Sequence, residues 1–117
     1  MTQHDDGVFL LHMLDAARAV RRFMVDRSRD DLHGDELLLA GVIQKLEVIG
    51  EAANRVGEEG RRSMPDLPWR QLVDMRNRLI HGYFAVDPDI VWATVTTNVP
   101  ELIRLLVRGG VGSSPDE

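Results

Sequence analysis

The segment from Arg76 to Tyr83 carries the densest group of chemically active side chains in the chain. Within eight residues it holds two guanidiniums, an amide, an imidazole and a phenol, supplied by Arg76, Asn77, Arg78, His81 and Tyr83. A guanidinium suits paired hydrogen bonds to a phosphate, and an imidazole with its ordinary pKa of about 6.5 can accept or donate a proton near neutrality. The segment is therefore the candidate for acid–base chemistry on a phosphate.

Helix geometry limits how these side chains can meet. At about 100° per residue, Arg76 and Tyr83 would lie within about 20° of one face if a helix continued through the segment. His81 would then be displaced from Arg76 by about 140°. One ideal helix does not gather all three side chains. Either Gly82 ends the helix so that the backbone redirects His81, or a second chain completes the site.

The elements that must position the segment are helices. Apolar residues at spacings of three and four predict a first helix over about residues 7–28, with Asp5 or Asp6 available to cap its start. A polar turn is expected around residues 30–34. A second apolar stripe from Leu39 to Val56 predicts a second helix, with Gly57 as its C-terminal cap.

The second half of the chain follows the same pattern. A loop is expected over residues 60–67, and Pro68-Trp69 suits the first turn of a third helix, whose end carries the chemical segment. Asp87-Pro88-Asp89 predicts the start of a fourth helix. Pro100 lies inside that helix and is expected to kink or split it, because proline cannot donate the backbone hydrogen bond to Thr96.

These elements predict an all-α fold, an antiparallel bundle of four to five helices. The 117 residues fit one domain, which we place at residues 1–110, followed by a disordered tail at 111–117. No apolar run approaches the roughly 20 residues of a membrane span. The chain has no cysteine, and its acidic N-terminus is unlike a secretory signal. A soluble, cytoplasmic protein is expected.

Charge restricts how the chain could bind nucleic acid. Its formal net charge is −5, which is unfavourable for broad electrostatic attraction to phosphates. Any RNA site must therefore be a local patch. His4, His12 and His33 have no metal-ligand spacing, so neither a metal site nor a cofactor is predicted.

The segment from Arg76 to Tyr83 resembles the motif of the HEPN superfamily, and within it of the HepT-like proteins. In that motif an arginine is followed after four residues by a histidine and after one more residue by a tyrosine, as in Arg76, His81 and Tyr83. Further segments carry the same resemblance over most of the chain: residues 49–54, 65–69, 86–87, 91–92 and 100–102. The motif alone is a weak pattern, but its combination with Asn77 and these flanks is specific.

The resemblance implies a metal-independent endoribonuclease that is the toxin of a type VII toxin–antitoxin pair. It also implies a homodimer in which both motifs face one cleft. The partner would be an MntA-like nucleotidyltransferase, which silences the nuclease by attaching AMP to the motif tyrosine, here Tyr83.

Each motif residue can be given a role in such a reaction. Cleavage by the RNA's own 2′-hydroxyl needs one group to take a proton and another to give one. His81 supplies one such group per chain, so two copies across a twofold axis could divide the roles. Arg76 would stabilise the transition-state charge and Asn77 would orient Arg76 or the phosphate, while Tyr83 would bind the phosphate.

Other interpretations of the same residues remain open. Arg76 could simply favour the negative end of a helix, and His81 could be a capping residue. Arg78 could be solvated or contact the RNA backbone. We expect Glu51 to pair with an arginine of the third helix as structural support, and Trp69 and Trp92 to be core or interface anchors.

The acidic net charge leaves an alternative function open. The chain could be a catalytically inactive module that binds a nucleotide or a partner, serving as the antitoxin or as a structural dimer.

Overall fold

Helices make up nearly all of the chain that the structure describes. This computed structural model describes the backbone of residues 3–81 and 87–113, and the side chains of residues 5–80 and 87–113. The long helices are α1 (Gln3–Phe23), α3 (Glu36–Arg55), α5 (Trp69–His81) and α7 (Val99–Arg108). The short elements are α2 (Arg29–Gly34), α4 (Glu58–Ser63), α6 (Pro88–Ala93) and η2 (Thr94–Asn98). No strand occurs within the described ranges.

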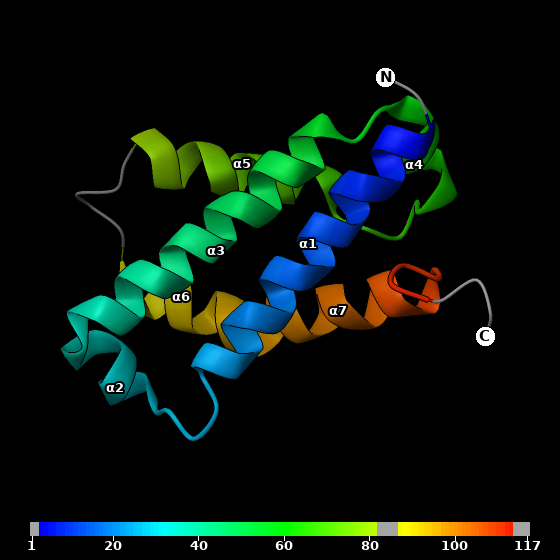
Figure 1. Cartoon of the computed structure of the whole chain (residues 1–117). Helices are drawn as coiled ribbons and strands as arrows, with labels where there is room; N and C mark the ends of the chain where they lie inside the picture. The colour runs from blue at the N-terminus through cyan, green and yellow to red at the C-terminus, as the bar shows by residue number, and fades with distance from the viewer. Residues whose placement is uncertain (1–2, 82–86, 114–117) are drawn as a thin grey trace.

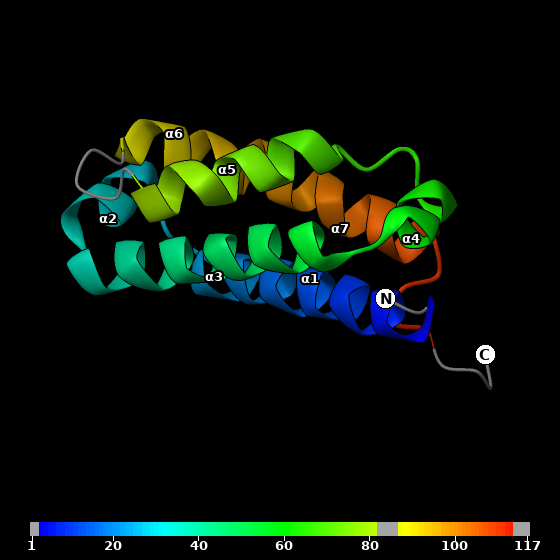
Figure 2. The same ribbon diagram turned by 90° about the horizontal axis from the view of Figure 1, so that it is seen from above.

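The long helices form an antiparallel bundle in two layers (Figures 1 and 2). Helix α1 packs on α3 and on α7, and α3 also packs on α5. Figure 2 shows α1 and α3 in one layer, with α5 and the α6–α7 stretch in the other. Each long helix runs opposite to the one before it in sequence, as the colours of Figure 1 show. The predicted all-α antiparallel bundle is confirmed.

The core lies between these layers and draws on every long helix. Its completely buried large side chains are Met13, Leu14, Val20, Leu32, Val42, Leu46, Ile49 and Leu106. Trp69 and Trp92 are partly buried and pack against this core, as expected for anchors. The indole N–H of Trp69 donates to the Met64 carbonyl at 3.0 Å, and the Arg61 guanidinium lies 5.3 Å from the ring centroid.

The first helix was predicted too late at both ends. Helix α1 begins at Gln3 and ends at Phe23, not at residues 7 and 28. It ends early because the chain turns through Asp26, whose φ of 58° is left-handed; aspartate tolerates that region better than most residues do. Asp6 lies inside α1, so it does not cap the start of this helix.

The polar stretch at residues 30–34 is a helix, not the predicted turn. Helix α2 begins with a capping box: the Ser28 hydroxyl accepts from the Asp31 N–H, and the Asp31 carboxylate accepts from the Ser28 N–H. Leu32 anchors α2 by full burial in the core. Six residues suffice because both ends are tied down, although so short a helix is unstable alone.

The predicted loop at 60–67 contains part of another short helix, α4. Asp6, which is 2% exposed, reaches from α1 and accepts hydrogen bonds from the N–H groups of Gly57 at 2.8 Å and Gly60 at 3.0 Å. A carboxylate there satisfies the first donors of α4 and complements its positive end. Gly57 therefore precedes α4 and has an ordinary φ of −77°; it is not a left-handed cap of α3.

Pro100 was expected to kink or split the last helix, but the helical stretch runs on from Pro88 to Arg108, and only a π-helical turn before the proline interrupts its α-helical pattern. Asp87 caps the start of α6 by accepting from the Asp89 N–H at 2.8 Å. Before the proline, η2 widens the helix into one π-helical turn, in which the Val99 N–H bonds the Thr94 carbonyl. This wide turn accommodates a residue that cannot donate its own bond.

By length and composition alone, the 21-residue stretch Pro88–Arg108 would also suit a membrane span. Its inward side chains, including Val91, Val95, Val99, Leu102 and Leu106, belong to the core of the bundle. The stretch is therefore the fourth helix of the bundle. After this helix, Val111 packs against the core, and its N–H donates to the Leu106 carbonyl at 3.0 Å. The first residue of the predicted tail is therefore in contact with the bundle.

Candidate active site

Backbone packing between α3 and α5 fixes the position of Arg76. A Cβ atom placed on Gly50 would lie 2.2 Å from the Arg76 Cβ and 2.9 Å from the Leu72 carbonyl oxygen. Real Cβ atoms do not approach so closely, so only glycine allows the two helices to meet here. The base of the Arg76 side chain is consequently held against the backbone of α3.

The Arg76 guanidinium is held from two sides. Its Nη2 lies 2.7 Å from Oε2 of Glu51 on α3, and its Nη1 donates to Oδ1 of Asn77 at 2.9 Å. Glu51 thus pairs with an arginine of the third long helix, and Asn77 orients that arginine. The Arg76 side chain is 27% exposed, and its buried Nε has no hydrogen-bond partner among the described residues. A charged donor fork is therefore fixed at the edge of solvent.

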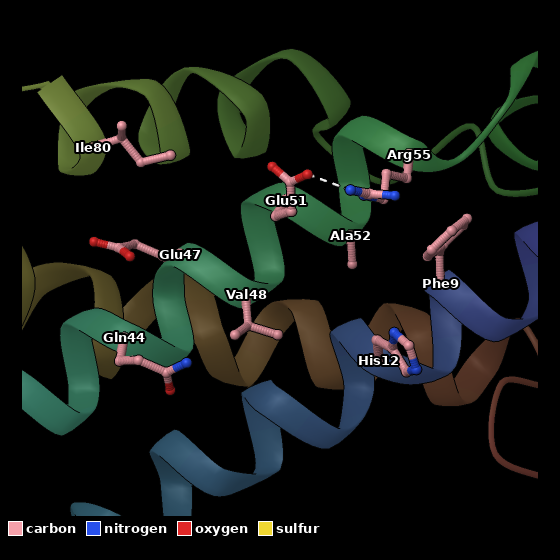
Figure 3. A pocket seen from close by; sticks show the side chains of 9 residues that line it. All are labelled: Phe9, His12, Gln44, Glu47, Val48, Glu51, Ala52, Arg55 and Ile80. Carbon is pink, nitrogen blue, oxygen red and sulfur yellow. Dashed lines mark hydrogen bonds and ion pairs between the residues drawn. The ribbon is translucent and has the colours of Figure 1, made fainter.

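Glu51 joins Arg76 to a second arginine on its own helix. The Arg55 Nε donates to Oε1 of Glu51 at 3.0 Å, drawn as the dashed line in Figure 3. The hydrogen bond from Arg55 and the charge of Arg76 hold the pKa of the Glu51 carboxyl below its ordinary value, although partial desolvation opposes them. Two guanidiniums share one carboxylate, so the cluster carries one net positive charge.

Arg76 and Arg78 serve different faces of α5. Arg78 lines a groove of about 760 Å³ between α5 and the α6–α7 stretch, whereas Arg76 faces α3. Arg78 has no hydrogen bond or ion pair with any described residue. The two arginines therefore cannot act on the same phosphate within one chain.

Of His81 and Tyr83, the structure describes only the backbone of His81. Helix α5 extends to His81 itself, which places its backbone about 7.5 Å along the axis from Arg76 at 1.5 Å per residue. The side chain of His81 lies outside the described residues, and so do Gly82 and Tyr83. The predicted turn at Gly82 and the roles of His81 and Tyr83 stay predictions.

A cavity of about 460 Å³ borders the Arg76 cluster (Figure 3). It follows the outer face of α3 between α1 and the last turn of α5, where Ile80 forms one wall. Glu51 and Arg55 of α3 stand on its rim, and Phe9 and His12 of α1 line the side away from Ile80. Among the described residues, no group of three or more His, Asp or Glu side chains could hold a metal ion.

Sequence reasoning missed Arg55 and Phe9. Arg55 carried a readable signal, because Glu51 and Arg55 are four residues apart on one helix and such pairs are neighbours. Phe9 carried none, since its apolar spacing is that of an ordinary core stripe. Only the packing of α1 beside α3 brings its ring under Arg55.

Comparisons with known proteins identify the family of this chain. A model of the family described as "Ribonuclease HepT-like" matches residues 13–108. A protein of Methanocaldococcus jannaschii, named as a candidate RNase, is 33% identical over 102 residues, covering 87% of this chain and 94% of its own. A protein of Thermococcus cleftensis, named as a candidate ribonuclease HepT, is 34% identical over 94 residues, or 80% and 86% of the two chains.

A third relative, from Caldanaerobacter subterraneus and also named as a candidate RNase, is 36% identical over 84 residues, covering 68% of this chain and 75% of its own. No solved structure matches this chain. The family model spans nearly the whole bundle, including the Glu51–Arg76 pair and the segment up to Tyr83. The chain belongs to the HepT-like ribonuclease family.

Proposed function

We propose that the protein is a metal-independent endoribonuclease with Arg76 and His81 as its catalytic residues. Membership of a ribonuclease family supports the activity, and the fixed Arg76 guanidinium supports the location of the active site at Arg76. Glu51 and Asn77 hold that cation before substrate arrives, so it needs little reorganisation to stabilise charge developing on a phosphate. This preorganised cation is the observation on which the proposal rests.

In the proposed reaction, His81 takes the proton of the 2′-hydroxyl, and the 2′-oxygen attacks the adjacent phosphorus. The bond from phosphorus to the 5′-oxygen then breaks, leaving a 2′,3′-cyclic phosphate and a 5′-hydroxyl. His81 of the partner subunit protonates the leaving 5′-oxygen. Arg76 binds the non-bridging oxygens, whose negative charge increases in the transition state.

Cleavage of RNA by purified variants tests the catalytic residues. We expect His81→Ala and Arg76→Ala each to lose at least a hundredfold in rate, the usual scale for an acid–base group or a fixed charge donor. Arg70→Ala is the matched control, since it removes an exposed arginine from the first turn of the same helix. Activity of His81→Ala equal to that of the wild type would refute the assignment.

We further propose that the active species is a homodimer with a composite site. One chain supplies one His81, whereas the reaction uses two proton-transfer groups. Mixed dimers of wild-type and His81→Ala chains, separated by two different tags, test this. A composite site predicts that a dimer with one histidine loses most of its activity. Retention of half of the wild-type rate would show that each chain works alone.

The regulatory part of the proposal is that this ribonuclease is the toxin of a type VII toxin–antitoxin pair, silenced by AMP on Tyr83. An MntA-like nucleotidyltransferase would be the antitoxin. AMP adds bulk and negative charge where a phosphate must bind. Intact mass after incubation with ATP and that enzyme should rise by one or more AMP units, and Tyr83→Phe should abolish the rise. A rise retained in Tyr83→Phe would move the acceptor elsewhere.

The net charge of −5 favours a second candidate, a catalytically inactive module that binds a nucleotide or a partner and serves as the antitoxin or a structural dimer. The same cleavage assay separates the two functions. Absence of cleavage by the wild-type protein over a panel of RNAs would support the inactive module.

A further inference from the structure

The cavity beside the Arg76 cluster combines an apolar floor with a charged rim. Phe9, Val48 and Ile80 supply apolar walls, and Glu51 and Arg55 stand at the rim (Figure 3). Its volume of about 460 Å³ is within the usual range of small-molecule sites. Charged residues are depleted from the centres of protein interfaces, so this rim suits a polar ligand with an apolar face better than a second protein surface.

Two contacts hold the guanidinium of Arg55 in place on that rim. Glu51 accepts from its Nε at 3.0 Å, and its guanidinium carbon lies 5.9 Å from the centroid of the Phe9 ring. A carboxylate thus fixes one edge of the guanidinium, while an aromatic face backs it at cation–π distance. Since its orientation is already set, a ligand that contacts Arg55 loses less side-chain entropy than it would at a free arginine.

The outer side of Arg55 remains available. The Arg55 side chain is 56% exposed despite its two contacts. Unpaired RNA bases stack on arginine planes as well as on aromatic rings, and stacking tolerates any base because every base has a π-face. The His12 ring, one turn further along α1, packs edge-on against the Phe9 ring with the two centroids 6.1 Å apart. His12 thus helps to hold the Phe9 ring in place beneath Arg55.

Arg55 is linked to the proposed catalytic arginine through one carboxylate. Glu51 contacts Arg55 at 3.0 Å through one oxygen and Arg76 at 2.7 Å through the other. A phosphate bound at Arg76 would therefore have Arg55 within about one nucleotide of it. On this geometry, and resting on the ribonuclease function proposed above, we infer that Arg55, backed by Phe9, is a stacking subsite for an unpaired base next to the scissile phosphate.

The inference assigns a substrate class, single-stranded RNA, and a binding residue that the motif does not contain. A base inside a duplex has both faces covered by its neighbours, so it cannot stack on Arg55. The subsite binds through shape and π-contact, because Glu47 and Glu51 at the same cavity offset the charges of Arg55 and Arg76.

Binding of RNA to Arg55→Lys tests the subsite, because lysine keeps the charge but lacks the planar group. Arg62→Lys is the matched control, since Arg62 forms the same i,i+4 pair with Glu58 at 3.2 Å on α4, away from the cavity. The probe is a fluorescein-labelled oligonucleotide made entirely of 2′-O-methyl nucleotides. It cannot be cleaved, so its affinity is measured by anisotropy independently of catalysis. Thermal melts verify that each variant is folded.

We expect Arg55→Lys to bind the single strand roughly tenfold more weakly, in the lower part of the range for stacking of one base. Its affinity for the matching duplex, and the salt dependence of binding, should equal those of the wild type. Arg62→Lys should bind both forms normally. Unchanged single-strand affinity of Arg55→Lys would overturn the subsite.

A second experiment compares the binding of the same RNA with and without one base, which an abasic nucleotide removes. Cleavage of the unmodified RNA by the wild type first locates the scissile phosphate, and the abasic nucleotide is then placed next to it. Removing the base should weaken wild-type binding roughly tenfold but leave Arg55→Lys almost unaffected, because both changes remove one stacking contact. Equal losses in the two proteins would mean that base and side chain do not meet.

Failure of this inference is distinct from failure of the proposed function. A wild-type protein that cleaves RNA, with Arg55→Lys binding equally well, refutes the subsite alone. A wild-type protein that neither cleaves RNA nor binds the single strand refutes both.

Discussion

Gly50 is where α3 and α5 come closest, and its replacement by alanine tests whether that approach positions Arg76. The added Cβ would lie 2.2 Å from the Arg76 Cβ and 2.9 Å from the Leu72 carbonyl oxygen. Neither is the end of a flexible side chain, so the two helices must move apart. Overpacking of this kind costs about 1–3 kcal/mol, and contact with backbone atoms puts Gly50→Ala at the upper end.

Part of that cost is offset within α3 itself. Alanine favours a helix interior by about 1 kcal/mol over glycine, so the net destabilisation of Gly50→Ala should be about 2 kcal/mol. For a domain of this size, that loss lowers the melting temperature by roughly 6–12 °C. Urea unfolding followed by circular dichroism measures the free energy directly.

Gly41→Ala is the matched control on the same helix. Its Cβ would meet the Phe23 ring at 3.6 Å, an ordinary van der Waals contact. No steric clash opposes the higher helix propensity of alanine at this position, so Gly41→Ala should stabilise the protein by up to about 1 kcal/mol. The two substitutions are chemically identical, and only the local spacing distinguishes their effects.

Gly50→Ala should also lower RNA cleavage beyond any loss of folded protein, since a displacement of about 1 Å at a catalytic group can cost a hundredfold in rate. If Gly50→Ala proved as stable as Gly41→Ala, the close approach of α3 and α5 would be refuted. Destabilisation with an unchanged cleavage rate per folded molecule would instead refute the role of this contact in placing Arg76.

Three further predictions concern charged side chains. Asp6→Asn replaces one of the two oxygens that accept from Gly57 and Gly60 and should cost about 1–3 kcal/mol in urea unfolding, whereas exposed Asp15→Asn should have little effect. The pKa of Glu51 is lowered in the folded state, so its stabilising contribution is present above its unfolded pKa of about 4.5 and is lost as the pH falls through the lower folded pKa. The difference in unfolding free energy between wild type and Glu51→Gln should therefore shrink as the pH falls below about 4.5. A constant difference down to pH 3 would contradict the pairing of Glu51 with the two arginines. Arg55→Ala should weaken binding of single-stranded RNA at least as much as Arg55→Lys does, because alanine also lacks the planar group that stacks on a base; anisotropy titrations measure this, and a smaller loss for Arg55→Ala would show that stacking on Arg55 does not hold the strand.

The sequence determined the helices whose signals are local. Apolar residues recurring every three or four positions placed the four long helices, and Asp87-Pro88 placed the start of α6, because periodicity and capping act within a few residues. Helix α2 was also within reach, since Ser28 and Asp31 form a capping box three residues apart. The motif from Arg76 to Tyr83 stood out by residue type alone.

Contacts between distant residues decided the rest. Asp6 caps α4 across more than 50 residues, so the local sequence of α4, which has acidic residues in its first turn and basic residues in its last, did not contain the cap. Likewise, the pairing of Glu51 with Arg76 instead of Arg78 depends on the register of α3 against α5, which Gly50 sets by permitting backbone contact. The motif supplied the residues that we propose act on phosphate, and tertiary packing determined which arginine is fixed and placed Arg55 over Phe9 beside it.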